Sequence, residues 1–339
     1  MLVRSAVRSA LAALPRPGPT ALRLLINAVA LTILIVLFAV LSDKFLTPAN
    51  ATNVLRQISI VVTVGCFFTL LMVSGGIDLS IGGVVGVSGM VSVLLVNMGA
   101  PLPLAFAAAV ALGTLVGAFN GFMVSVVGIN TVIATLGTMY VTRGATQVLG
   151  GGMSVRPKDP GYAFIGSGDI GPIPTMVVIM VVVLVVALVL ERRTAIGRFA
   201  VLVGSNPRGA RLNGLPVRTT QALLFILTGA AAGFAGVMVS SRFMAAQPGS
   251  GTGFEFDVLI ATLLGGTSLL GGEGSVVGLL LGALIVGTVT TGLNILGIPS
   301  FIQTVLLGAV LIAAVGFDAV VRGRRGHLAR RVAAKDAAA

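Results

Sequence analysis

Residues 71–83 read LMVSGGIDLSIGG, and they lie between two long apolar runs. The adjacent glycines Gly75 and Gly76 favour a helix end, because glycine adopts the backbone conformations that stop a helix. A carboxylate such as Asp78 accepts hydrogen bonds from free N–H groups at a helix start. The stretch therefore predicts one helix ending at Gly75–Gly76 and another with Asp78 near its N-cap. Two interpretations stay open, a structural cap at a tight turn or a turn that also lines a pathway.

The composition is that of a membrane protein. Of 339 residues, 56% are hydrophobic and 9% are charged, with a mean hydropathy of +1.08. A soluble domain could not bury this much apolar surface, so lipid must surround most of the chain. The single Cys66 and the single His327 exclude an intrachain disulfide and argue against a Cys/His metal site. We expect Cys66 to be an inert core residue.

Ten segments are apolar and long enough to cross a bilayer, so we predict an all-α polytopic membrane protein. The predicted spans are 23–42, 55–74, 78–97, 102–125, 129–149, 174–191, 219–241, 257–271, 275–296 and 299–320. GINTVIATL (128–136) resembles GIPSFIQTV (297–305), and each opens the last span of a five-span half. Because five is odd, duplicated halves would have opposite orientations, and we predict two inverted five-helix halves.

The net charge of +12 is distributed as in a membrane protein, not as in a nucleic-acid-binding protein. Sixteen Lys and Arg residues lie in the two ends and in segment 192–218, against six elsewhere. The positive-inside rule therefore puts both termini and segment 192–218 in the cytoplasm. We divide the chain into a basic N-terminal segment (1–22), a membrane domain (23–320) and a basic tail (321–339). The first span is expected to remain uncleaved.

No motif for catalysis is present, so we expect no enzyme activity, cofactor or metal site in this chain. A Walker A motif needs a lysine after a glycine, and none of the three lysines follows a glycine. Any ATP-driven role therefore requires a partner that binds ATP and Mg²⁺. Ion-coupled transporters usually carry acidic residues deep in their spans, and here only Asp78 is placed there.

Segment 192–218 predicts a short helix over 206–213. Asn206 is placed as its N-cap, Pro207 as its first residue and Gly214 just beyond its end. The segment is basic and contains no acidic residue. It could bind lipid headgroups, or it could be a docking helix for a cytoplasmic partner.

Three stretches together resemble the sugar permeases of bacterial ATP-binding-cassette importers, of the ribose and xylose type. They are SGGIDLSIGG, TAIGRFAVLVGSNPRGARLNGL and the C-terminal region that contains FEFDVLIATLLGGTSLLGGEG. The similarity covers about residues 50–318. Departures are small: Gly209 stands where the family usually has Ala, Val258 where Ala is common and Asn213 where Ser is usual.

The resemblance implies a permease dimer in the inner membrane, formed by two copies or by paralogues. It also implies cytoplasmic ATPase subunits or fused modules and an external sugar-binding protein, which would select the sugar. Coupling to the ATPase is expected from the matching residues of segment 192–218: Gly197, Arg198, Gly204, Asn206, Arg208, Ala210, Arg211 and Gly214. A branched-chain amino acid permease is the alternative within the neighbouring branch, and an ion-coupled secondary transporter is a more distant one.

A neutral sugar favours a polar but uncharged lining, because a fixed charge gains little from it and holds water. For the pathway and its structural turn we predict Gly75, Gly76, Asp78, Asn120, Asn294 and Gln303. Each polar side chain could instead bond to a neighbouring helix. Glu255 and Asp257 are expected at the outer rim, where they would contact the binding protein, although Asp257 could simply cap the eighth helix.

Overall fold

A computed structural model describes residues 19–313 and 315–316, and its regular structure is almost entirely helical. Among these residues the strands are β1 (Asp169–Ile170) and β2 (Ile173–Pro174), which pair antiparallel. The long helices are α2 (Pro19–Leu41), α3 (Pro48–Val73), α4 (Ile81–Asn97), α5 (Leu102–Phe122), α6 (Thr131–Leu149), α8 (Thr175–Arg193), α9 (Ala195–Ser205), α11 (Val217–Phe243), α12 (Phe254–Leu264) and α13 (Val276–Ile295). The short ones are η1 (Met123–Val127), η2 (Pro160–Ala163), α7 (Phe164–Ser167) and α10 (Pro207–Leu212), and a last helix covers Ser300–Ala313.

The all-α prediction is confirmed, and a helix occupies each of the ten predicted spans. Six described helices are long and apolar enough to cross a bilayer: α2, α3, α5 with η1, α8, α11 and α13. The other four spans are the shorter or more polar helices α4, α6, α12 and Ser300–Ala313. The tail (321–339), which contains His327, and residues 1–18 of the basic N-terminal segment lie outside the described residues.

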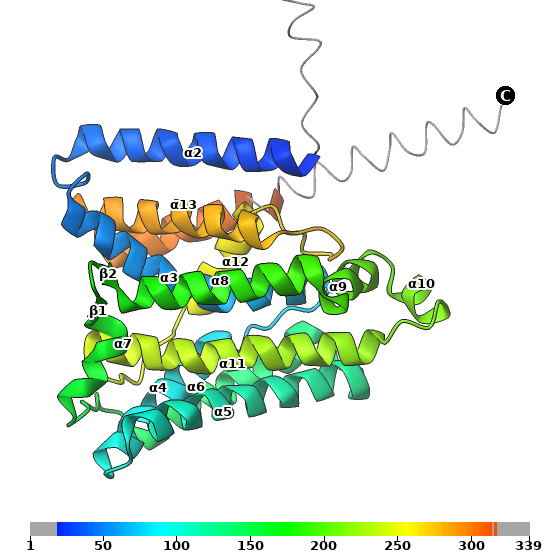
Figure 1. Ribbon diagram of the computed structural model, residues 1–339, viewed down its shortest axis with the longest axis horizontal. Helices are drawn as coiled ribbons and strands as arrows, with labels where there is room; N and C mark the ends of the chain where they lie inside the picture. The colour runs from blue at the N-terminus through cyan, green and yellow to red at the C-terminus, as the bar shows by residue number, and fades with distance from the viewer. Residues whose placement is uncertain (1–18, 314, 317–339) are drawn as a thin grey trace, which may run out of the picture.

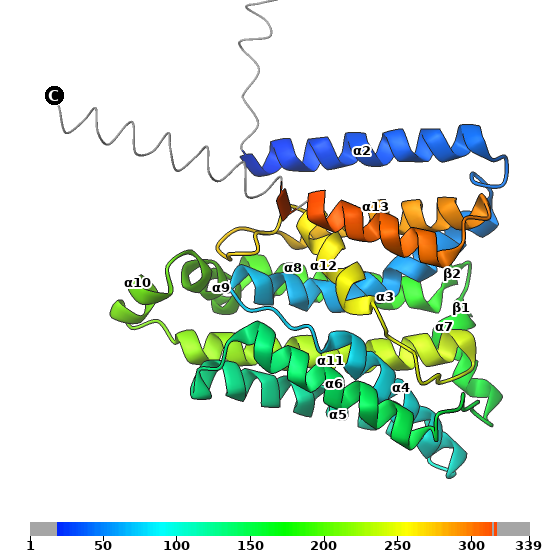
Figure 2. The same ribbon diagram turned by 180° about the vertical axis from the view of Figure 1, so that it is seen from behind.

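Two of the shorter helices, α4 and α12, begin in the interior of the bundle. Figure 2 shows the chain after α3 and the chain after α11 each running back along the bundle before α4 and α12 begin. The two starts touch, because a Cβ added at Gly82 of α4 would collide with the Glu255 carboxylate of α12 and the Gly251 carbonyl. Irregular backbone at this depth is tolerated where protein shields it.

Small residues let the helices approach closely. Gly113 and Gly117 of α5 lie against the backbone of Gly229 and Gly233 of α11. A Cβ at Gly113 would come within 2.7 Å of the Gly233 Cα atom, so no larger residue fits. In lipid the burial of apolar surface does not drive helices together, because the lipid is apolar too. Close packing of backbones, as here, does drive their association.

The packing has the same order in both halves of the chain. In the first half α4 packs on α5, and in the second half α12 packs on α13. Across the halves α4 packs on α11, α12 packs on α3, and α3 packs on α11. α4 and α12 occupy corresponding positions in the two halves, and the chain reaches their starts from opposite ends of the bundle. Two inverted five-helix halves predict this arrangement.

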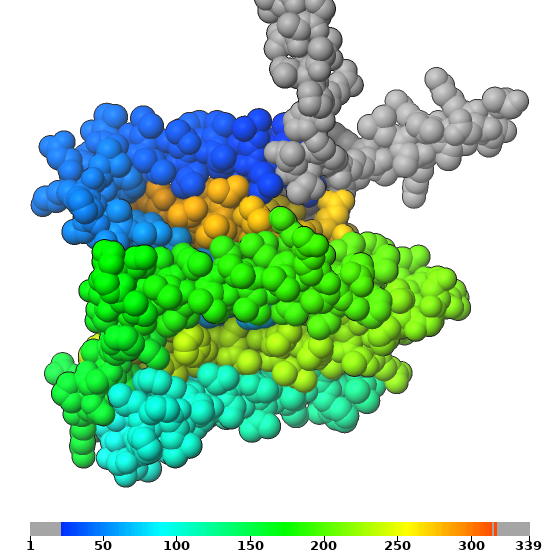
Figure 3. Space-filling model, in the orientation of Figure 1, coloured from blue at the N-terminus to red at the C-terminus, as the bar shows by residue number. Residues whose placement is uncertain are grey.

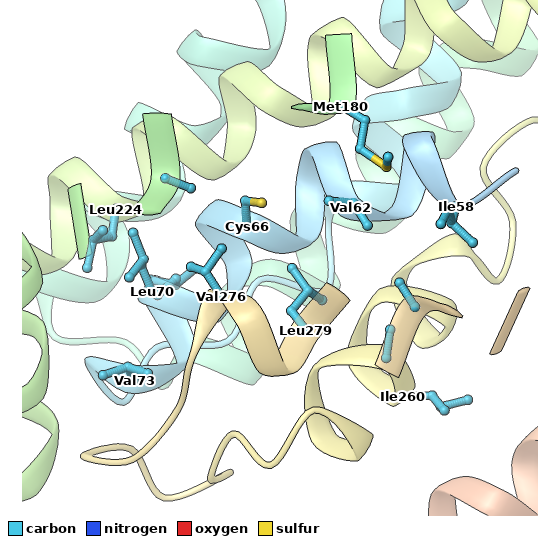
Figure 4. Packing of buried hydrophobic residues seen from close by; sticks show 14 of the residues in the cluster. Ile58, Val62, Cys66, Leu70, Val73, Met180, Leu224, Ile260, Val276 and Leu279 are labelled. Carbon is cyan, nitrogen blue, oxygen red and sulfur yellow. The ribbon is translucent and has the colours of Figure 1, made fainter. Parts of the chain in front are cut away.

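The largest buried cluster surrounds α3. Cys66 is a fully buried free thiol in this cluster, close to Val62, Leu70 and Leu279 (Figure 4). Its place supports the expectation of an inert core residue. At one end of the bundle α10 projects beyond the other helices (Figures 1 and 3). The start of α2 lies toward the same end, and the β1–β2 hairpin lies at the opposite end (Figure 1).

Candidate functional site

The glycine pair ends α3 as the sequence predicts. The Gly75 N–H donates to the Met72 carbonyl at 2.9 Å, and the Gly76 N–H donates to the Leu71 carbonyl at 3.0 Å. Gly75 has a φ of 86°, the left-handed conformation that closes helix ends and that glycine adopts without strain. The pair therefore turns the chain out of α3 and into the non-helical segment 74–80.

Asp78 does not cap α4, and this part of the prediction is wrong. Ser80 is the N-cap residue of α4, and its side chain makes no capping bond. The Asp78 Oδ1 atom instead accepts from the Ser80 N–H at 2.9 Å and from the Ser80 hydroxyl at 2.6 Å. Asp78 thus shapes the turn that enters the helix. It is 1% exposed, and such a buried carboxylate must be satisfied by nearby donors.

Asn120 supplies a further donor and joins three elements. Its Nδ2 donates to the Ser80 hydroxyl at 2.8 Å and to Asp78 Oδ1 at 3.3 Å. Its Oδ1 accepts from the Thr138 hydroxyl of α6 at 2.7 Å. Asn120 is fully buried, so the structure places it in a closed polar network and not in an open passage.

Glu255 forms an ion pair inside the bundle. Its Oε1 atom lies 2.6 Å from a guanidinium nitrogen of Arg143 on α6, and the two side chains are 2% and 28% exposed. The expectation that Glu255 faces an external partner is therefore wrong. A carboxylate in an apolar bundle is tolerated when a cation pairs with it, and Arg143 provides that cation.

Asp257 follows Glu255 in the first turn of α12 and is partly exposed. It lines a groove of about 420 Å³ between α12 and the helix Ser300–Ala313, together with Gln303. The Gln303 Nε2 donates to the Asn294 Oδ1 and to the Ile298 carbonyl, each at 2.8 Å. The structure therefore brings together two of the predicted pathway residues, Asn294 and Gln303. It also places the carboxyl group of Asp257 in the same groove as Gln303.

Within the described residues no cluster of three His, Cys, Asp or Glu side chains is arranged to bind a metal.

The short helix in segment 192–218 forms as predicted. Asn206 is the N-cap of α10 and accepts from the Gly209 N–H at 2.9 Å, with Pro207 as the first helical residue. Gly214 closes the helix with a φ of 73°. Ala210 is buried against Val203 and Val217, which fixes α10 to the body of the protein.

The basic side chains of this segment remain available. Arg198, Arg208 and Arg211 are exposed. The sequence interpretation missed α9, which precedes α10 and carries Arg198. Gly197 is buried at the junction of α8 and α9, where a Cβ would collide with the Glu191 carbonyl.

The C-terminal end of α9 touches the end of α3. A Cβ added at Gly204 would collide with the Val73 carbonyl and approach the Gly272 nitrogen to 2.6 Å. The Gly272 N–H donates to the same Val73 carbonyl at 2.8 Å. The Gln221 side chain also donates to the Ser74 carbonyl at 3.0 Å. Backbone contacts therefore connect α9, the end of α3 and the loop between α12 and α13.

Residues 50–315 match the family described as the permease component of branched-chain amino acid transport systems. The chain belongs to this permease family. It is 36% identical over 265 residues to the ribose import permease RbsC of Escherichia coli K12, covering 77% of this chain and 83% of that protein. It is 36% identical over 260 residues to RbsC of Bacillus subtilis 168, covering 76% and 81%. It is 35% identical over 262 residues to the D-allose permease AlsC of Escherichia coli K12, covering 76% and 80%. No solved structure matches the chain.

Family membership confirms three of the predictions. A permease component is a transport subunit and not an enzyme. Together with six long apolar helices, it makes the chain a multi-pass protein of the inner membrane. The resemblance to sugar importer permeases holds over most of the chain.

The structure adds residues that the sequence interpretation did not select. Ser80 and Arg143 each bond to a predicted site residue. A signal for Arg143 was present, because an arginine within the apolar span 129–149 requires a buried partner. No sequence signal indicates that this partner is Glu255, which lies 112 residues away.

Proposed function

We propose that this chain is the transmembrane permease subunit of an ATP-driven importer, which passes a monosaccharide delivered by an external binding protein. The relatives named above import ribose or transport allose, and a further relative is an L-arabinose permease. The observation that carries the proposal is α10, a capped helix that projects from one end of the bundle and is fixed to it.

The partner at α10 is an ATP-binding-cassette ATPase subunit. The exposed guanidinium groups of Arg198, Arg208 and Arg211 favour an acidic surface on that subunit. ATP and Mg²⁺ are bound by the ATPase, so this chain itself needs no cofactor. A second permease, either a copy or a paralogue, completes the membrane part, and lipid surrounds it.

The orientation follows from charge. By the positive-inside rule, the end of the bundle that carries α10 and the start of α2 faces the cytoplasm, because the six arginines of segment 192–218 belong to that end. The end with the β1–β2 hairpin faces outward and meets the sugar-binding protein.

Movement of the ATPase reaches the membrane interior through segment 74–80. Val73 directly precedes this segment and contacts Gly204 of α9, as does Gly272 of the loop between α12 and α13. At the other end, Asp78 bonds to Asn120 in the bundle. A shift of α9 is therefore transmitted along segment 74–80 to the start of α4.

Reconstitution into proteoliposomes with the partner ATPase and the sugar-binding protein tests the proposal. We expect ATP-dependent uptake of at least one of D-ribose, D-allose and L-arabinose, and stimulation of ATP hydrolysis by the loaded binding protein. The control omits ATP or the binding protein. Uptake that continues without ATP and stops when the proton gradient is collapsed would instead establish an ion-coupled transporter.

The family description itself favours one alternative, a branched-chain amino acid importer. The same proteoliposomes distinguish the two substrate classes when radiolabelled leucine replaces the sugars. ATP-dependent leucine uptake without sugar uptake would assign the chain to the amino acid class.

A further inference from the structure

The groove between α12 and the helix Ser300–Ala313 is polar in one half and apolar in the other. The polar side chains of Asp257, Gln303 and Thr304, with Phe256 beside them, line the half where both helices begin. Leu307 and Leu311 line the half that follows along the chain. α13 runs from the end of the bundle that carries α10 to the opposite end. The helix Ser300–Ala313 follows it and therefore begins at the end of the bundle that carries the β1–β2 hairpin. The polar half is therefore the outer one in the proposed orientation.

Asp257 is the chemically unusual residue of the groove. Its carboxylate makes no hydrogen bond or ion pair within the described residues, whereas the neighbouring carboxylate of Glu255 is paired with Arg143. Asp257 also lines a smaller cavity of about 70 Å³ beside Gln57. An unpaired carboxylate in an apolar bundle is costly, so an ionisable residue placed there indicates a functional site.

We propose that this groove is a binding subsite of the permease for a neutral sugar. The Asp257 carboxylate accepts hydrogen bonds from sugar hydroxyls, and such charge-assisted bonds are stronger than neutral ones. Phe256 is 48% exposed and offers an aromatic surface to the apolar face of a sugar ring. The volume of about 420 Å³ falls within the range of roughly 300–1,000 Å³ for small-molecule sites.

This inference rests on the proposed function and identifies where the substrate would bind. It also revises the expectation of an uncharged lining, because Asp257 lies beside Gln303 in the groove. A free amino acid fits the site less well, since the described residues that line the groove include no Lys or Arg to pair with its carboxylate.

Protection of an introduced cysteine tests the subsite in the assembled transporter. Thr304→Cys places a thiol in the groove, and Val305→Cys places one on the same helix outside it. Wild-type protein gives the background, because its one cysteine, Cys66, is fully buried. The labelling rate with N-ethylmaleimide is measured with D-ribose, D-allose, L-arabinose, leucine or no addition.

We expect the transported sugar to slow the labelling of Thr304→Cys at least threefold and to leave Val305→Cys unchanged. Asp257→Asn combined with Thr304→Cys should require about tenfold more sugar for the same protection, since a hydrogen bond to a charged acceptor is lost. Asp169→Asn, which changes an exposed carboxylate paired with Arg56, should have no effect.

Two results would overturn the inference in different ways. If the complex imports a sugar that does not protect Thr304→Cys, the subsite is absent and the proposed function stands. If leucine protects Thr304→Cys and no sugar is imported, both the subsite and the sugar assignment fail.

Discussion

At the scale of single residues, Asp78 and Asp159 make the same local hydrogen bond in different surroundings. Each carboxylate accepts from the N–H two residues ahead, at 2.9 Å for Asp78 and at 2.8 Å for Asp159. Asp159 is exposed, whereas Asp78 is buried and also accepts from Asn120. Water can replace a lost partner at Asp159, and it cannot do so at Asp78.

We therefore predict that Asp78→Leu lowers the free energy of unfolding by about 2–5 kcal/mol, since it leaves the donors of Ser80 and Asn120 unpaired. Asp78→Asn keeps one acceptor and should retain partial transport. Asp159→Leu is the matched control and should cost about 1 kcal/mol or less. Thermal unfolding of the purified protein measures all three variants. A fully folded but inactive Asp78→Asn protein would show that the charge itself takes part in transport.

The Arg143–Glu255 pair predicts coupling between two mutations. Arg143→Leu and Glu255→Gln should each lower the free energy of unfolding by about 2–4 kcal/mol, because each leaves the other polar group without its partner. The double variant should cost less than the sum of the two, by at least about 1 kcal/mol. Thermal unfolding of the wild type, the two single variants and the double variant completes this double-mutant cycle. Simple additivity would mean that the pair contributes nothing to stability.

At the scale of elements, the success of the sequence prediction depended on how far apart the interacting groups lie. The ends of α3 and α10 were predictable, because Gly75 and Asn206 act on backbone groups within a few residues of themselves. Glu255 was misplaced because its partner Arg143 is distant in sequence. The start of α4 was misplaced because Asp78 accepts hydrogen bonds from Ser80 and from Asn120 of α5. The contact with Asn120 joins residues 42 positions apart, so the sequence around Asp78 does not predict it.

Gly204 predicts a defect in transmission. Gly204→Ala should separate α9 from Val73 and Gly272, because the added methyl group has no space. We expect ATP hydrolysis that no longer responds to the loaded binding protein, and uptake reduced by at least tenfold. Gly137→Ala of α6 is the control: nothing lies within 4 Å of its added Cβ, and alanine stabilises a helix by up to about 1 kcal/mol. Unchanged stimulation in Gly204→Ala would exclude this route.

α10 predicts a charge-dependent contact with the ATPase. Arg208→Glu reverses an exposed charge on α10 and should reduce the amount of ATPase that co-purifies with the permease at least fivefold. Arg193→Glu reverses an exposed charge at the end of α8, outside α10, and should have a smaller effect. Quantitative pull-down at two salt concentrations measures both. Equal losses in the two variants would indicate general attraction and not docking by α10.

At the scale of the whole molecule, two interrupted helices meet in the middle of the bundle. α4 is entered from the end that carries α9 and α10, and α12 is entered from the opposite end. Their first turns meet at Gly82 and Glu255. Segment 74–80 thus connects the proposed cytoplasmic face to the centre, and the α11–α12 connection reaches the same point from the outer face.

This arrangement predicts which surfaces an impermeant thiol reagent can reach. Leu212 of α10 and Ile170 of β1 are exposed at opposite ends of the bundle, at 83% and 49%. Since the basic residues place α10 in the cytoplasm, Ile170→Cys should be labelled in intact spheroplasts, and Leu212→Cys only after permeabilisation. Wild-type protein is the control, because its buried Cys66 should not react. Labelling of Leu212→Cys in intact spheroplasts would reverse the orientation and place the arginines of α10 outside, beyond the reach of any ATPase.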